Sequence, residues 1–279
     1  MLFLSRLFVI AIYCFCFSTA AFGLDIGSNI TINDQNPLGV VGWVPAAEDG
    51  EVEPGMQDKQ IWDLEGVFLD QHNVLSMVGG FNFMSGAPGY EDKYPSGDIF
   101  LATKSKPDYE ATTRTVPAGK DNFLVNNSYG YDFVFDLTFN GVDGGAYSLF
   151  AIDGSSMVET AYYPVNEGSS PWQYNSSDNP NNLAVLEGEF WFDFGLSDTE
   201  VGFLGDTADA PNSHYLLTGF DLSFLGGAND FYAHFTMGCG NDNLMGYGET
   251  VPTPEPSTFL LMGVGGGLLW FARRRKART

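Results

Sequence analysis

Residues 131–139, YDFVFDLTF, give the clearest indication of the fold class of this chain. Apolar and polar side chains alternate along it, with Phe133, Phe135, Leu137 and Phe139 on one side and Asp132, Asp136 and Thr138 on the other. Because successive side chains of a β-strand point to opposite faces, this period of two predicts a strand with one buried and one exposed face.

Residues 183–194, LAVLEGEFWFDF, repeat this alternation over a longer stretch. Phe190, Phe192 and Phe194 are expected on the same face as Leu186, which is the face toward the core. The opposite face of this strand then carries a mixed set of side chains: Leu183, Val185, Glu187, Glu189, Trp191 and Asp193.

The rest of the body consists of short apolar segments separated by turn-rich ones. Further strands are expected at 62–69, 74–83, 98–103, 146–152, 214–225 and 231–237, and a long exposed loop at 166–182. No stretch shows the apolar period of an amphipathic helix. The 24 Phe and 34 Gly residues also favour short strands joined by turns. We therefore predict an all-β body at residues 24–248, a single antiparallel β-sandwich of jelly-roll type.

The first 23 residues have the three-part pattern of a secretory signal peptide. Arg6 precedes an uncharged run at residues 7–17, and small residues follow. Ala21 and Gly23 satisfy the small-x-small rule, which places the cleavage after Gly23, with a cleavage after Ala21 as the alternative. An uncleaved membrane anchor or a buried N-terminal helix is the other interpretation, and the short length of the run disfavours it.

The C-terminal end divides into three parts. Residues 249–257 are a Pro-rich linker, residues 258–272 are expected to form a transmembrane helix, and residues 273–279 are a basic tail. The basic residues of the tail are Arg273, Arg274, Arg275, Lys276 and Arg278. Since positive charge is retained on the cytoplasmic side, the body belongs on the opposite side of that membrane. The uncharged residues 259–272 span only about 21 Å as a helix, which suits a transient anchor.

The sequence Pro254, Glu255 and Pro256, followed by a short apolar helix and an Arg-rich end, resembles the PEP-CTERM sorting signal of Gram-negative bacteria. In that family a membrane-embedded cysteine protease, an exosortase, recognises the motif and releases the body to the envelope or extracellular matrix. The resemblance implies an exosortase as partner, a precursor anchored in the inner membrane, and a bacterium that makes exopolysaccharide. A plain C-terminal tail anchor is the alternative.

Segments of the body are also similar to a family of PEP-CTERM proteins whose shared body has no assigned role. These segments are WDLEGVFLDQ (62–71), VGGFNF (78–83), SGDIFLAT (96–103), YDFVFDLTF (131–139), HYLLTGFDLSFLG (214–226) and HFTMGCGNDNLMGYG (234–248). They cover most of the body, but this second resemblance implies no activity.

The body is strongly acidic. Between residues 24 and 254 the chain has 34 acidic and six basic residues, a formal charge of −28. Phosphate backbones and anionic lipid repel such a body, so a nucleic-acid ligand is excluded. Bound calcium would offset the repulsion between the carboxylates. Loops rich in Asp and Asn offer suitable oxygens without matching a known calcium motif, at residues 140–145, 177–182, 206–212 and 241–243.

Side chains that carry out catalysis are few. His72, His214 and His234 form no pair at metal-ligand spacing, so a zinc site built from neighbouring ligands is absent and three separate histidines are expected. Cys239 lies in the Gly-rich turn MGCGNDN, where close packing explains a small residue as well as a thiol nucleophile with His234 as its base. Cys14 and Cys16 leave with the signal peptide, so no intramolecular disulfide is available.

The candidate sugar-binding face is formed by Glu187, Glu189, Trp191 and Asp193. These residues place carboxylates about 7 Å apart beside an aromatic ring, as sugar-binding faces and glycoside hydrolases do. Their spacing differs from the acid cluster of sandwich-fold glucanases, and we expect no enzyme. The expected function is that of an envelope or matrix protein that associates with exopolysaccharide or the cell surface. A carbohydrate-active hydrolase and a self-assembling surface protein are the alternatives.

Overall fold

The computed structural model describes residues 24–32, 56–57, 59–89, 93–109, 111, 120–162, 170–204, 213–227 and 229–252. Within these ranges the chain is almost entirely β-structure, as the alternating segments predict. The predicted signal peptide, transmembrane helix and basic tail lie outside the described residues. No helix inside the described ranges has the length and apolar character that a membrane crossing needs.

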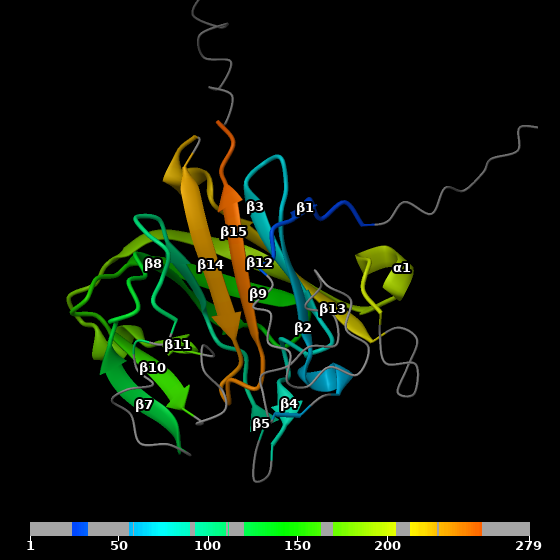
Figure 1. The fold of residues 1–279 in the computed structure, drawn as a ribbon, viewed down its shortest axis with the longest axis horizontal. Helices are drawn as coiled ribbons and strands as arrows, with labels where there is room; N and C mark the ends of the chain where they lie inside the picture. Colours follow the sequence, from blue (N-terminus) through cyan, green and yellow to red (C-terminus); the bar gives the residue numbers. More distant parts are fainter. Residues whose placement is uncertain are drawn as a thin grey trace, which may run out of the picture.

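Ten strands form one antiparallel sheet. In sheet order they are β1 (Ser28–Asn29), β2 (Leu64–Leu69), β3 (Val74–Gly79), β13 (His214–Asp221), β12 (Ala184–Leu196), β9 (Gly144–Ala151), β8 (Phe133–Phe139), β6 (Ile99–Ala102), β14 (Asp230–Thr236) and β15 (Asn243–Glu249). Figure 1 shows β14 and β15 crossing in front of β9 and β12, so the sheet curls and supplies both layers. The all-β, antiparallel fold predicted from the sequence is confirmed, with two layers that are continuous through one sheet.

Smaller elements complete the fold. A three-stranded sheet has the order β11 (Gln173–Tyr174), β10 (Met157–Tyr162) and β7 (Lys120–Asn126), and a two-stranded sheet pairs β4 (Ala87–Pro88) with β5 (Lys93–Tyr94). The helices of the described ranges are η1 (Gln60–Trp62), η2 (Ser176–Asp178), α1 (Asp198–Val201) and η3 (Ser223–Leu225). A capping box of Ser197 and Glu200 starts α1, because each side chain satisfies a backbone N–H group of the other residue.

The main core lies on the inner face of the curled sheet. Inward side chains from both layers meet there, each at most 2% exposed: Phe190 of β12, Leu217 of β13, Phe231 and Phe235 of β14, and Leu244 of β15. Removing such a side chain from water contributes about 1.5–3 kcal/mol. The inner face is therefore the source of most of the stability of the fold.

A first cover protects part of the outer face, and we call it the β7–β10–β11 cover. Outward residues of the large sheet, among them Phe100 of β6, Val134 of β8 and Phe150 of β9, pack against Val158 of β10 and Tyr174 of β11. Because the sheet is apolar on both faces here, its strands are buried on both sides.

A second cover, the α1 cover, protects the outer face at the other end of the strand order. Phe68 of β2, Val78 of β3 and Leu216 of β13 pack against Val201 of α1 and Phe203 just after it. The rings of Phe68 and Phe203 meet edge to face at 5.9 Å between centroids. Between the two covers, outward residues of β8, β9 and β12 remain exposed or half-buried.

The two edges of the large sheet are joined by residues 28–32. Ile30 donates its N–H to the carbonyl of Val67 in β2 at 2.9 Å and accepts from the N–H of Tyr247 in β15 at 2.9 Å. Ile32 donates to the carbonyl of Met245 at 2.7 Å, and Thr31 forms a bridge to Gly246. We call this the 28–32 seam.

The polar segment 166–182 differs from the expected exposed loop in its described part, residues 170–182. Trp172 is 5% exposed and Tyr174 is 1% exposed, and β11 pairs with β10. Asp98 explains this burial, because its buried carboxylate accepts the N–H of Tyr174 at 2.7 Å while its own N–H donates to the carbonyl of Trp172 at 2.7 Å. The backbone hydrogen bonds of residues 172–174 thus bury part of this segment in spite of its polar composition.

Phe194 is the second departure from the expected pattern, because it is 66% exposed although Phe190 and Phe192 are buried. The pairing of β12 with β13 shifts register between Phe194 and Leu196, where Gly195 adopts φ 73°. This irregularity places Phe194 at the end of the core face, where its ring stacks on Phe192 at 6.2 Å.

Candidate functional site

The outer face of the large sheet carries an exposed strip between its two covers. Antiparallel pairing places Glu187 of β12 opposite Ser148 of β9, and Ser148 opposite Asp136 of β8. The next row holds Glu189, Ala146 and Thr138, and the third holds Trp191 between Gly144 and Thr218. We call these rows, with Asp193 beyond Trp191, the outer strip.

Trp191 is the aromatic residue of the outer strip, and it is 57% exposed. The residue at its flank on β13 is Gly219, whose φ of 113° is one that side-chain-bearing residues rarely adopt. A Cβ at position 219 would lie 2.7 Å from Cε3 of Trp191. The indole therefore lies against bare backbone, and the sheet holds it while much of its surface faces solvent.

The structure places the four residues of the candidate sugar-binding face along the outer strip. Glu187, Glu189 and Asp193 are exposed on the same side of β12 as Trp191. Asp193 accepts the backbone N–H of Phe194 at 2.8 Å, which fixes its carboxylate at the end of the strip. The arrangement is an acidic surface that carries the ring of Trp191.

Asp136 is a residue of the outer strip that the sequence pattern did not single out. Its side chain is half-buried, and burial raises the pKa of its carboxyl group. Within the described residues its carboxylate has neither a hydrogen bond nor an ion pair. Asp98, which directly precedes the neighbouring strand β6, is 3% exposed and accepts the N–H of Leu137 at 2.8 Å. Burial and then the charge of Asp136 raise the pKa of Asp98 well above its usual range.

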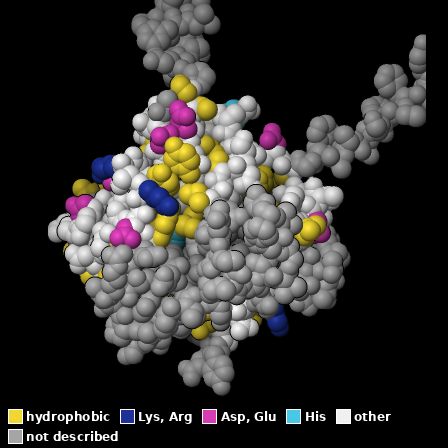
Figure 2. Space-filling view, in the orientation of Figure 1, with side chains coloured by type: hydrophobic (Ala, Val, Ile, Leu, Met, Phe, Trp, Pro, Cys, Tyr) yellow, Lys and Arg dark blue, Asp and Glu magenta, His cyan; other side chains and the backbone are white. Residues whose placement is uncertain are grey.

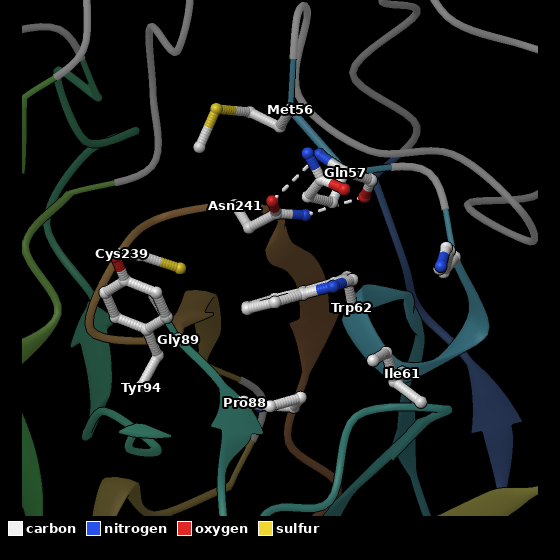
Figure 3. Close-up of a pocket in the computed structure, with 10 residues that line it drawn as sticks. Met56, Gln57, Ile61, Trp62, Pro88, Gly89, Tyr94, Cys239 and Asn241 are labelled. Carbon is white, nitrogen blue, oxygen red and sulfur yellow. Dashed lines mark hydrogen bonds between the residues drawn. The ribbon is translucent and has the colours of Figure 1, made fainter. Parts of the chain in front are cut away.

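The cavity in Figure 3 is a separate feature of the fold, at the end where η1 and β5 meet the turn after β14. Its volume is about 530 Å³, and the rings of Trp62 and Tyr94 form part of its wall. The centroids of these two rings are 5.9 Å apart, and their planes are inclined by 58°. Asn241 exchanges two hydrogen bonds of 3.0 Å with the backbone of Gln57. No histidine or carboxylate is among its described lining residues.

Cys239 lines this cavity and is 4% exposed. It belongs to the main core, whereas the ring of His234 stacks on Tyr131 at 5.7 Å under the β7–β10–β11 cover. Because these are opposite faces of the sheet, the structure does not assemble the thiol and imidazole into a nucleophile with its base.

His214 has a different environment, because two carboxylates flank it. Its Nδ1 lies 2.8 Å from Oε2 of Glu65 and its Nε2 lies 3.0 Å from Oδ1 of Asp198. Gln60 donates to the other oxygen of Glu65 at 2.6 Å. His72 lies exposed in the turn between β2 and β3, so the three histidines are separate, as the sequence predicts.

The oxygen-rich loops use several of their side chains to hold backbone groups. Asn140 accepts the N–H groups of Val142 and Asp143, and Asp242 accepts those of Leu64 and Asn243. Within the part of the chain that the structure describes, no group of three His, Cys, Asp or Glu side chains is placed to hold a metal ion. The calcium site stays a prediction.

On the opposite layer, Figure 2 shows hydrophobic side chains gathered along β14 and β15, with acidic side chains at one end of the strands. The register places Tyr232 opposite Tyr247, and their rings lie 4.9 Å apart. A hydrogen bond to Asp230 raises the pKa of Tyr247. These two rings contact each other, whereas Trp191 lies against Gly219.

Residues 252–276 match the family model of the PEP-CTERM protein-sorting motif. The chain carries a PEP-CTERM sorting signal. No curated protein and no solved structure matches the chain. The PEP-CTERM match contains Pro254, Glu255, Pro256 and the first four basic residues of the tail, and Arg278 follows it. A PEP-CTERM signal indicates an exported protein that an exosortase sorts and that a membrane anchors transiently.

Proposed function

We propose that the body is a non-enzymatic polysaccharide-binding domain, which the sorting signal delivers to the envelope or matrix of a Gram-negative bacterium. In this proposal the exosortase cleaves near the PEP-CTERM motif, and the released body associates with exopolysaccharide or the cell surface. The outer strip is the binding surface. Glu187, Glu189, Trp191 and Asp193 contact the polymer.

The observation that carries the proposal is the exposure of Trp191. A tryptophan with 57% of its side chain exposed gives up the stabilisation that burial of its ring would bring. Its ring offers an apolar surface with a polar edge, which matches a sugar ring that has apolar C–H faces and polar hydroxyl groups. The backbone at Gly219 of β13 supports the ring, so little conformational freedom is lost on binding.

The position of the carboxylates favours binding over hydrolysis. Glu187 and Glu189 are two residues apart on one strand, so their side chains extend in the same direction, about 7 Å apart. A hydrolase instead flanks the scissile bond with two carboxyl groups and buries the one that acts as general acid. Both glutamates are exposed, and β12 contributes no residue to the cavity of Figure 3.

The test uses protein released from cells and a glycan array, followed by an assay of reducing-sugar release on any polymer that binds. We expect binding without sugar release, and loss of binding in Trp191→Ala. Leu124→Ala is the matched control, because Leu124 is an exposed apolar residue of β7 outside the outer strip. Undiminished binding by Trp191→Ala would refute the site, and sugar release would establish the hydrolase alternative.

A further inference from the structure

The outer strip has no positive charge of its own. Strands β8, β9, β12 and β13, which form or border it, contain no Lys or Arg. The strip carries four carboxylate side chains: Asp136, Glu187, Glu189 and Asp193. A uronate or sulfate polymer would bring further negative charge to this surface and would be repelled.

Two of these carboxylates lie in the same row of the strip. Asp136 and Glu187 flank Ser148, with neighbouring strands about 4.8 Å apart. Their Cα atoms are therefore about 10 Å apart, with a hydroxyl group between them. A polymer that lies along β12 meets the row of Asp136 and Glu187 at one end of the strip, and the ring of Trp191 followed by Asp193 toward the other.

Asp136 should make this row of the strip favour a cationic ligand. A half-buried carboxylate has lost part of its hydration, and it regains stabilisation when a positive charge comes within hydrogen-bonding distance. The structure supplies Asp136 with no such partner among the described residues, whereas the neighbouring Asp132 is paired with Lys104. Among the described residues, no cationic side chain therefore offsets the charge of Asp136, and a cationic ligand would do so.

We propose that the ligand of the outer strip is a polysaccharide of amino sugars whose amino groups are free and positively charged. One sugar ring lies on Trp191, and ammonium groups of the following sugars face Glu189, Glu187 and Asp136. This inference rests on the proposed polysaccharide-binding function and narrows its ligand class by charge.

The probes are chitosan oligomers, their fully N-acetylated counterparts, dextran and alginate, offered to the released protein at matched ionic strength. The acetylated and free oligomers have the same backbone and differ in the charge of the amino group. We expect the free oligomers to bind at least about tenfold more tightly, which corresponds to about 1.4 kcal/mol, and alginate to bind least.

Variants separate this site from the general acidity of the body. Asp136→Asn and Glu187→Gln should each reduce the ratio of free-amine to acetylated oligomer affinity several-fold, because each variant removes a negative charge that faces an ammonium group. Asp25→Asn removes the same charge from an exposed position outside the strip and should have no effect.

The outcomes distinguish the two proposals. Equal binding of both oligomers that Trp191→Ala abolishes would refute the amino-sugar inference and leave polysaccharide binding in place. An effect of Asp25→Asn as large as that of Asp136→Asn would also refute the inference, because attraction would then be nonspecific. Binding of none of the four polymers would refute both proposals.

Discussion

Glu65 and His214 form a fully buried pair, with Oε2 of Glu65 2.8 Å from Nδ1 of His214 and both side chains 0% exposed. The pair connects β2 to the first residue of β13, and Asp198 extends it to the start of α1. Burial lowers the pKa of His214, but the hydrogen bond and charge of Glu65, followed by those of Asp198, outweigh burial and raise it overall. Folding therefore favours the imidazolium form of His214, which can donate a hydrogen bond to each of the two carboxylates.

This pair predicts a loss of stability at alkaline pH. A histidine whose pKa is raised on folding contributes its full stabilisation below the pKa of the unfolded chain, about 6.5, and loses it as pH rises through the folded value. We expect the urea midpoint to fall over that interval and His214→Gln to remove the dependence. His72→Gln, in an exposed turn, should retain it. A wild-type midpoint that is constant from pH 6 to 9 would contradict the assignment.

Removing the carboxylate tests the same pair at fixed pH. Glu65→Gln leaves His214 buried with the partly exposed Asp198, 3.0 Å from Nε2, as its remaining acidic partner. Breaking a buried charged pair from one side costs about 3–5 kcal/mol, so thermal unfolding should occur well below the wild-type temperature. The double variant Glu65→Gln with His214→Gln should recover part of the loss, and purely additive effects would show that the two residues are uncoupled.

The sequence predicts the faces of individual strands well, because alternation is local. Trp191 and Glu189 are exposed and Phe190 and Phe192 buried, as the period of two indicates. The sequence does not reveal which strands become neighbours, because β13 pairs with β3 and β12 pairs with β9, and other strands lie between the members of each pair in the chain. Asp136 therefore could not be assigned to the same surface as Trp191 before the register was known.

Gly219 offers a test of how the sheet supports Trp191. In Gly219→Ala the new Cβ would clash with the indole, and φ 113° is unfavourable for alanine, so we expect a loss of about 1–3 kcal/mol. Gly154→Ala is the control, because a Cβ there meets only one atom, at 3.9 Å. Adding Trp191→Ala should relieve the clash but not the backbone strain, as a double-mutant cycle of melting temperatures would show.

Cys239 should behave as a structural residue. Because its side chain is 4% exposed, a thiol reagent reaches it only when the surrounding structure opens. We expect the native released protein to react slowly with Ellman's reagent and to react completely in urea. A fast reaction of the native protein would indicate an accessible thiol and reopen the question of a nucleophile at the cavity.

Sorting should depend on the PEP-CTERM motif. We expect Glu255→Ala to leave the uncleaved form in the inner membrane, because the substitution alters the sequence that the exosortase recognises. Immunoblotting of membrane and released fractions measures this. Glu249→Ala, an exposed acid at the end of β15 and outside the matched residues, serves as the control. Normal release of the Glu255→Ala protein would argue for a sorting route independent of this motif.

The contact between Glu65 and His214 could not be predicted from the sequence, for a different physical reason. Glu65 and His214 are polar residues within apolar segments, which is the signal that a sequence can offer. Their mutual contact depends on β2 being buried on both faces, and that burial depends on the α1 cover. Analysis of alternating side chains assumes that one face of a strand is exposed. It therefore cannot predict a strand that is buried on both faces and carries one member of a buried charged pair.

Because of the 28–32 seam, folding of the body can be completed only after export of the body is complete. Its residues come almost first in the body and β15 comes almost last, so Ile30 can join Val67 to Tyr247 only when both ends of the body are on the same side of the membrane. Until then β2 and β15 present unpaired backbone groups, which invite pairing with other chains. Closure is thus a late, long-range event, and partially translocated chains are the state in which this protein is most vulnerable to aggregation.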